Sequence, residues 1–259
     1  MNTGALGRLV LVPNTLDLGT TPTPIQQVLS AGVLQRAAGL SHWVVENGKA
    51  SRAFLKRVGE FTPLGTPLQA IDMRELPRPR KGAPNAVVEP REWQALLAPA
   101  LAGHDVGLLS DAGLPAVADP GAALVAAAHE LGLIVEPLPG PSSLTLALAA
   151  SGLNGQRFAF EGYLPQLADE RAVRVKELEA RSRREGQTQL VIETPYRNAA
   201  LLAALVQLLQ PNTRLSVACG LTSPGGWCRT WPVARWRQPG AVALPTMPPD
   251  LPAVFMWLA

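Results

Sequence analysis

The chain has 259 residues, of which 47% are hydrophobic and 17% are charged. A chain of this length and composition can bury one large core or two modest cores, which excludes disorder as its dominant state. The formal net charge of +3 is mildly basic, so the composition permits an anionic substrate without requiring one.

Missing sequence signals narrow the class of protein further. No apolar run approaches the ~20 residues that a membrane-spanning helix needs, and the first residues lack the basic region of a secretion signal. We therefore expect a cytoplasmic protein that makes no membrane contact. Cys219 and Cys228 have no histidine nearby, so we expect two free thiols and no bound metal.

The first half of the chain alternates short apolar runs with longer segments of helical periodicity. This pattern is typical of an α/β fold with a largely parallel sheet. Strands are predicted at residues 9–12, 42–46, 105–109 and 133–136, and helices at 24–35, 49–58, 89–102 and 120–131. The stretch at 75–84, rich in proline and arginine, predicts an exposed loop that could act as a lid.

The second half has more strands per helix, which favours a mixed sheet. Strands are predicted at residues 158–161, 189–192, 214–218, 227–233 and 253–257, and helices at 142–150, 169–185 and 198–209. We place the domain boundary at the prolines of residues 137–141, because they suit a stiff connection. The predicted domains are residues 1–137 and 138–259.

Two loops that follow apolar strands, residues 110–121 and 138–143, are rich in Gly, Pro, Ser and Asp. In an open parallel sheet, ligands bind outside the carboxyl ends of the strands, where such loops let the backbone approach closely. The two loops are therefore predicted to face one ligand crevice. The alternative is that both are only tight turns between a strand and a helix, and no known phosphate-binding pattern names the ligand.

Four motifs occur in the order found in a known family. Residues 110–121 resemble the S-D-A-G-x-P-x-x-x-D-P-G signature of the tetrapyrrole methylase family. Residues 137–143, 157–165 and 193–197 resemble P-L-P-G-P-S, R-F-x-x-E-G-[FY]-L-P and E-S-P-H-R of its small-subunit ribosomal RNA methyltransferase branch. Four motifs in order are far more specific than any one of them.

The resemblance implies a fold and a cofactor. It implies two unequal α/β domains with S-adenosylmethionine in the cleft between them, a homodimer, and methyl transfer to an acceptor. Carried over residue by residue, it implies cofactor contacts at Pro13, Ser110, Asp111, Ala112, Val117, Ser142, Ser143, Glu193, Ala218, Cys219 and Ala253.

Departures from the family pattern concern the acceptor. The segments at 13–19, 46–49 and 219–222 differ from their counterparts in that branch, whereas the cofactor motifs are better kept. Positive charge for an acceptor remains at Lys49, Arg52 and Arg197. The acceptor therefore stays open between RNA, which we favour, and a tetrapyrrole or another small molecule. A homologue that binds the cofactor or a nucleic acid without catalysis is the third possibility.

Two carboxylates have two interpretations each, and a third has one. Glu46 follows a predicted strand, and could accept a proton from the acceptor or cap the next helix. Glu193 could contact the cofactor or only pair with Arg197. Asp119 is predicted to be the N-cap of the helix that begins at Pro120.

Tryptophan and arginine cluster between residues 227 and 237. Such a cluster could stack bases and bind phosphates, but packing on an edge strand, with arginine stems covering apolar surface, is the simpler interpretation.

Overall fold

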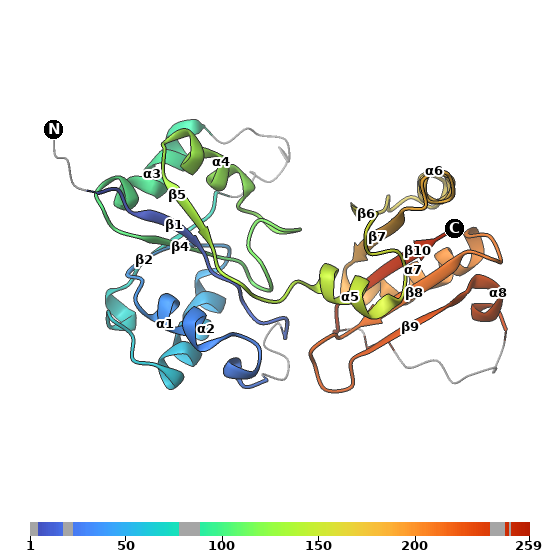
Figure 1. The fold of residues 1–259 in the computed structure, drawn as a ribbon, viewed down its shortest axis with the longest axis horizontal. Helices are drawn as coiled ribbons and strands as arrows, with labels where there is room; N and C mark the ends of the chain where they lie inside the picture. The colour runs from blue at the N-terminus through green and yellow to red at the C-terminus, as the bar shows by residue number, and fades with distance from the viewer. Residues whose placement is uncertain (1–4, 18–22, 78–88, 239–246, 249) are drawn as a thin grey trace. The chain divides into compact units, whose positions relative to one another are not determined.

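The computed structural model describes residues 5–17, 23–77, 89–238, 247–248 and 250–259. The chain divides into two compact units, Met1–Pro141 (unit 1) and Ser142–Ala259 (unit 2), which are described separately (Figure 1).

Unit 1 contains a five-stranded sheet whose strands all run parallel, in the order β3-β2-β4-β1-β5. Its strands are β1 (Arg8–Leu11), β2 (His42–Val45), β3 (Asp72–Glu75), β4 (Val106–Leu109) and β5 (Ile134–Pro137). Its helices are η1 (Ile25–Gln27), α1 (Ala31–Ala38), α2 (Gly48–Phe61), η2 (Leu68–Ala70), α3 (Pro90–Leu101) and α4 (Ala122–Glu130). The predicted parallel sheet of the first half is confirmed.

Helices cover both faces of this sheet, with α1 and α2 on one face and α3 and α4 on the other (Figure 1). The helices that follow β1 and β2 lie on the first face of the sheet. Strand β4 lies between these two strands, and the helix that follows it lies on the second face. This arrangement makes the carboxyl end of β4 a topological switch point, where open α/β sheets bind their ligands.

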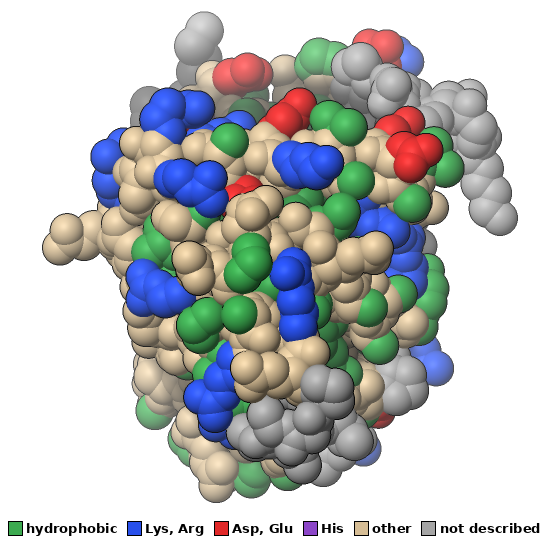
Figure 2. All heavy atoms as spheres, turned by 90° about the vertical axis from the view of Figure 1, so that its right-hand side faces the viewer, with side chains coloured by type: hydrophobic (Ala, Val, Ile, Leu, Met, Phe, Trp, Pro, Cys, Tyr) green, Lys and Arg blue, Asp and Glu red, His purple; other side chains and the backbone are tan. Residues whose placement is uncertain are grey.

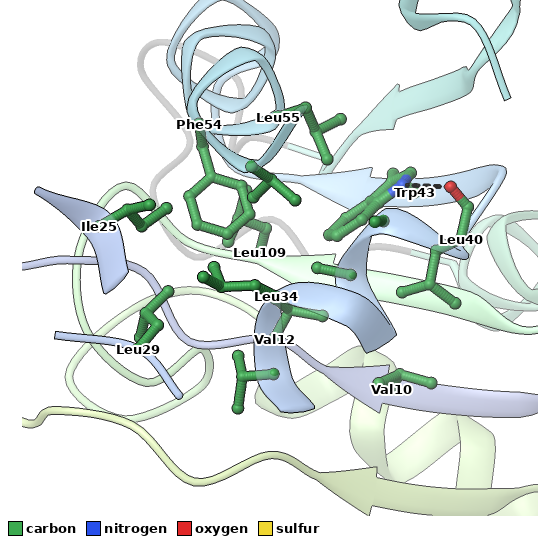
Figure 3. Close-up of a cluster of buried hydrophobic side chains, with 14 of the residues drawn as sticks. Val10, Val12, Ile25, Leu29, Leu34, Leu40, Trp43, Phe54, Leu55 and Leu109 are labelled. Carbon is green, nitrogen blue, oxygen red and sulfur yellow. Dashed lines mark hydrogen bonds between the residues drawn. The ribbon is translucent and has the colours of Figure 1, made fainter. Parts of the chain in front are cut away.

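The core beneath α1 and α2 is built around Trp43 (Figure 3). The Trp43 side chain is 1% exposed, and its Nε1 donates to the carbonyl oxygen of Leu40 at 3.2 Å. Gly107, on the neighbouring strand, leaves room for the ring, because a Cβ there would lie 2.7 Å from Trp43 Cε3. This packing fixes β2 and β4 side by side, and with them the loops that follow both strands.

Unit 2 contains a second five-stranded sheet, in the order β6-β7-β10-β8-β9. Only the β6–β7 pair is parallel, so the predicted mixed sheet is confirmed. Its strands are β6 (Phe158–Tyr163), β7 (Thr188–Glu193), β8 (Arg214–Cys219), β9 (Trp227–Pro232) and β10 (Ala253–Leu258). Its helices are α5 (Ser143–Ser151), α6 (Ala168–Glu185), η3 (Pro195–Arg197), α7 (Asn198–Leu208) and α8 (Val233–Trp236). Helices α6 and α7 pack on one face of the sheet and α5 on the other.

Two helix starts and one helix cap differ from the predictions. The first α-helix begins at Ala31 rather than at residue 24, because the Ser30 side chain caps it by accepting from Val33 N. Helix α4 begins at Ala122 with Gly121 as its N-cap, so the predicted capping role of Asp119 is wrong. Ser142 is the N-cap residue of α5 by position, but its side chain makes no capping hydrogen bond.

The sequence patterns also missed β3 and α8. Strand β3 is a polar edge strand, and its last residue, Glu75, lies inside the stretch predicted to be a loop. The rest of that predicted lid, from residue 78 on, lies outside the described residues. Both cysteines are free, as predicted.

Candidate functional site

Three loops meet at the carboxyl edge of the unit 1 sheet, and hydrogen bonds join them. Asn14 follows β1, Glu46 follows β2 and Asp111 follows β4. The Asn14 Nδ2 group donates to the carbonyl oxygens of Ser110 at 3.1 Å and Asp111 at 3.0 Å. The Glu46 Oε2 atom accepts from the backbone N–H of Asp111 at 3.1 Å. The start of the loop after β4 is thus held from both sides.

Glu46 does not cap α2, so that interpretation is wrong. The N-cap of α2 is Asn47, whose Oδ1 accepts from the backbone N–H groups of Lys49 and Ala50 at 3.0 and 3.3 Å. The Glu46 carboxylate is directed to the loop after β4 instead. Its second interpretation, as a proton acceptor, remains a hypothesis.

The loop after β4 folds back on itself through left-handed backbone. Gly113, Ala116, Ala118 and Gly121 have φ values of 65°, 65°, 63° and 129°. Positive φ is unfavourable for alanine, and residues held in such conformations concentrate at functional sites. The turn brings Asp119 close to Glu46 and Asp111. Burial and these two carboxylates raise the pKa of Asp119 to about 7.

The loop after β5 packs tightly on the segment after β1. The backbone N–H of Leu138 donates to the Leu11 carbonyl oxygen at 3.0 Å. A Cβ on Gly140 would lie 2.2 Å from the Cβ of Pro13, so only glycine fits there without movement. Residues 110–121 and the proline-rich loop were predicted to lie close together. Within unit 1, which ends at Pro141, they do, since a Cβ on Gly113 would lie 3.4 Å from the Pro141 carbonyl oxygen.

The predicted cofactor residues of unit 1 differ in exposure. Ser110 is 1% exposed, and its Oγ is buried with no hydrogen-bond partner among the described residues. Pro13 is buried, Ala112 is half-buried and Val117 is 45% exposed. A buried hydroxyl without a partner costs free energy unless a bound molecule satisfies it, which makes Ser110 a candidate contact for a polar ligand atom.

The predicted cofactor residues of unit 2 fall into two groups. Ser142 and Ser143 lie at the start of α5. Glu193, Ala253 and Cys219 form one row across β7, β10 and β8, because Ala253 pairs with both of the others.

Ala218 faces the α5 side of the sheet, whereas its neighbour Cys219 faces the α6 and α7 side. Burial, with a contribution from Asp250, raises the pKa of the Cys219 thiol. Ala218, Cys219 and Ala253 are at most 3% exposed, so a ligand at this edge would meet backbone more than side chain.

The positive residues predicted to meet the acceptor have different surroundings. Lys49 and Arg52 are exposed on α2. Arg197 forms an ion pair with Glu193, at 3.3 Å between Nη2 and Oε2. The pairing interpretation of Glu193 is therefore confirmed, and its contact with a cofactor stays a prediction.

Two site residues were not singled out from the sequence. Asn14 was noted only as a departure from a motif, although it connects the β1 and β4 loops. No sequence signal indicated this role, because the carbonyl groups that Asn14 bonds are 96 and 97 residues away in the chain. The function of Asn47 as the α2 cap was likewise missed, although Asn before a helical segment is a standard cap signal.

The described residues contain neither a membrane-spanning helix nor a cluster of metal ligands. No helix in this part of the chain is long and apolar enough to cross a membrane. No group of three or more His, Cys, Asp or Glu side chains in the same part is arranged to hold a metal ion.

The topology and the site together define the class: an α/β protein with a candidate ligand-binding edge on a doubly covered parallel sheet, followed by a mixed-sheet unit. Comparison with known proteins then identifies the family. Residues 34–231 match the model of the Tetrapyrrole (Corrin/Porphyrin) Methylases, and the chain belongs to that family. The family uses S-adenosylmethionine as its methyl donor.

Curated relatives are named ribosomal RNA small subunit methyltransferase I. The chain is 39% identical to the one from Mesorhizobium japonicum over 127 residues, which are 49% of this chain and 42% of the relative. It is 36% identical to the one from Escherichia coli O157:H7 over 143 residues, 55% of this chain and 46% of the relative. The chain thus spans less than half the length of these relatives.

Solved structures support the fold. The methyltransferase CobJ matches with a TM-score of 0.56 at 17% identity, over 97% of this chain and 94% of CobJ. The cobalamin synthesis related protein CobF from Corynebacterium diphtheriae matches with a TM-score of 0.54 at 14% identity, over 99% of each chain. The predicted family and the predicted two-part α/β fold are confirmed.

Proposed function

We propose that this protein is an S-adenosylmethionine-dependent methyltransferase. The observation that carries the proposal is the loop after β4, which combines the family signature with a switch-point position, left-handed backbone and the unpartnered Ser110 hydroxyl. Family membership supports the reaction type.

The residues present fit this cofactor. A buried hydroxyl and closely packed backbone suit the many polar atoms of a nucleoside and an amino acid, whereas a polyphosphate would need more positive charge. Ser110, Asp111, Ala112, Val117 and Pro13 are proposed to contact the cofactor in unit 1. Ser142, Ser143, Glu193, Ala218, Cys219 and Ala253 are the proposed contacts of unit 2.

The cofactor supplies a sulfonium-bound methyl group, and the chain must bind it, orient it and exclude water from it. Asn14 and Glu46 fix the loop that does so, because they bond its first carbonyl and N–H groups. Transfer to an N–H or O–H acceptor releases a proton. We propose Glu46 as the group that accepts it, since its carboxylate lies at this edge of the sheet.

Ribosomal RNA is the proposed acceptor, with Lys49, Arg52 and Arg197 as its proposed contacts. The names of the curated relatives support this choice. A cytoplasmic location and a homodimer are part of the same proposal.

Calorimetry with S-adenosylhomocysteine, the demethylated cofactor, tests the site. We expect micromolar binding by the wild-type protein and none by Asp111→Arg, which puts bulk and positive charge where the loop must meet the ligand. Glu130→Arg, on the exposed end of α4, is the matched control and should bind normally. Tight binding of NAD with none of S-adenosylhomocysteine would refute the assignment.

Transfer of a labelled methyl group tests the acceptor. Small-subunit ribosomal RNA incubated with labelled S-adenosylmethionine should gain label only with active protein, and digestion followed by mass spectrometry would locate the methylated nucleotide. Label in a tetrapyrrole rather than in RNA would support the small-molecule alternative. Cofactor binding without transfer to either would support a non-catalytic homologue.

A further inference from the structure

The charge of the chain is distributed unevenly. Residues 142–259 contain 12 Lys and Arg and 8 Asp and Glu, a net charge of +4, whereas residues 1–141 contain 11 and 12, a net charge of −1. Within unit 2, the 56 residues from 194 to 249 contain five arginines and no lysine, aspartate or glutamate. In Figure 2, acidic side chains gather mainly toward the top of the face, and Lys and Arg side chains continue below them.

Most arginines of this acid-free segment have local partners in the structure. Arg197 pairs with Glu193, and Arg214 donates to the Gly152 carbonyl oxygen at 3.5 Å. Arg237 donates to carbonyl oxygens at the end of α7, including that of Leu209 at 2.7 Å. Arg229 and Arg235 differ from these three, because among the described residues neither side chain has a hydrogen bond or an ion pair, and the one ring contact of each is with Trp231.

Arg229 and Arg235 are both exposed and both lie over the ring of Trp231. Their Cζ atoms are 5.4 and 4.5 Å from the ring centroid. This stacking holds a guanidinium in place while its N–H groups stay available and its charge stays unneutralised. The predicted packing of arginine stems on an edge strand is therefore present, and it also presents two charges to solvent.

The platform beneath the two arginines is rigid. Trp231 lies on the edge strand β9 and packs against Trp236, with ring centroids 5.0 Å apart. Trp236 is 7% exposed, and its Nε1 donates to the Leu215 carbonyl oxygen at 3.0 Å. A fixed pair of guanidinium groups loses little side-chain entropy when it binds an anion, and guanidinium groups match phosphate in geometry.

From these observations we propose that the exposed edge formed by Arg229, Trp231 and Arg235 (the arginine–tryptophan edge) binds the phosphate backbone of RNA. The proposal rests on the proposed function, because it supplies a second contact surface for the RNA acceptor. The two guanidinium groups contact phosphates, and the chain segment around them, residues 194–249, supplies no carboxylate that would repel the strand.

RNA binding by the double variant Arg229→Ala/Arg235→Ala tests the proposal. The probe is a fluorescein-labelled, single-stranded fragment of small-subunit ribosomal RNA, followed by anisotropy at low and moderate salt. Each phosphate contact on single-stranded nucleic acid contributes ~0.7 to the slope of log affinity against log salt. We therefore expect the RNA affinity of the variant to fall about tenfold at low salt. The magnitude of the negative slope should become smaller by about 1.4, because two phosphate contacts are lost.

Arg183→Ala/Arg184→Ala is the matched control, since it removes two exposed arginines from α6 of the same unit. It should retain most of the RNA affinity. Arg229→Lys/Arg235→Lys keeps the charge but removes the stacked guanidinium, and should have intermediate affinity. An equal loss in the α6 variant would mean that only total charge matters, and would overturn the proposal.

Calorimetry with S-adenosylhomocysteine and gel filtration separate this proposal from the proposed function. We expect cofactor binding and oligomeric state to be unchanged in all three variants. Unchanged RNA affinity in Arg229→Ala/Arg235→Ala, with cofactor binding intact, would refute RNA binding by the arginine–tryptophan edge. It would leave the proposed methyltransferase function unaffected. Dissociation of an oligomer by that variant would instead assign the edge to a protein contact and overturn the proposal.

Discussion

The pKa of Asp119 depends on residues that folding brings close to its carboxyl group. Burial of this carboxyl, with repulsion from the carboxylates of Glu46 and Asp111, raises its pKa to about 7. In the unfolded chain the same group titrates near 3.8. Between these two values the folded protein holds a proton that the unfolded chain releases, so stability falls as pH rises through this window.

Asp119→Asn should remove this pH dependence, because an amide of the same size cannot ionise. Relative to the wild type, we expect the variant to gain about 1 to 2 kcal/mol more stability at pH 8 than at pH 5, after allowance for solvent screening. Urea unfolding at the two pH values measures the difference. Glu130→Gln, which changes an exposed carboxylate at the end of α4, is the control. Equal effects of Asp119→Asn at both pH values would contradict the raised pKa.

At the scale of elements, the site depends on how closely the loops after β1 and β5 pack. Gly140→Ala would place a Cβ 2.2 Å from the Pro13 side chain, so the two loops must separate. We expect a loss of about 1 to 3 kcal/mol of stability, as for other overpacked sites, and weaker binding of S-adenosylhomocysteine. Urea unfolding and calorimetry measure the two effects.

Gly155→Ala is the matched control for this change, because a Cβ there meets no atom within 4 Å. It should alter neither stability nor binding appreciably. If Gly140→Ala bound the cofactor normally, the contact between these loops would not matter for the site.

Most elements could be predicted because their signals are local. Apolar runs bounded by Gly, Pro or Asp indicated nine of the ten strands found in the described residues. Strand β3 was missed, since its Asp-Met-Arg-Glu sequence lies at a sheet edge and buries little. The two site loops, residues 110–121 and 138–143, could be predicted because their richness in Gly, Pro, Ser and Asp is also a local signal. The roles of Asn14 and Asp119 could not be predicted, because the atoms they meet lie on strands brought together only by folding.

At the scale of the whole molecule, the four hydrophobic clusters of the described residues each lie within a single unit. A substitution that creates a cavity in the core of unit 2 should therefore lower the stability of unit 2 and leave that of unit 1 unchanged. Leu205→Ala removes a fully buried side chain from α7 and should cost about 2 to 5 kcal/mol. We expect hydrogen exchange to accelerate in β8 and β10 but not in β1 and β4.

Leu146→Ala is the control, because this leucine is 37% exposed on α5 of the same unit. Its effect on exchange should be small. Acceleration in β1 and β4 by Leu205→Ala would show that the two units unfold as one.

The position of β10 has a consequence for synthesis on the ribosome. This strand comes last among the described strands but lies at the centre of its sheet, paired with β7 and β8 on either side. Until β10 emerges, β6–β7 and β8–β9 are two separate ribbons with unsatisfied inner edges. The strands described for unit 1 all precede β10 in the chain. We therefore expect a nascent chain in which unit 1 can fold while the sheet of unit 2 stays open and aggregation-prone until the six residues of β10 are added.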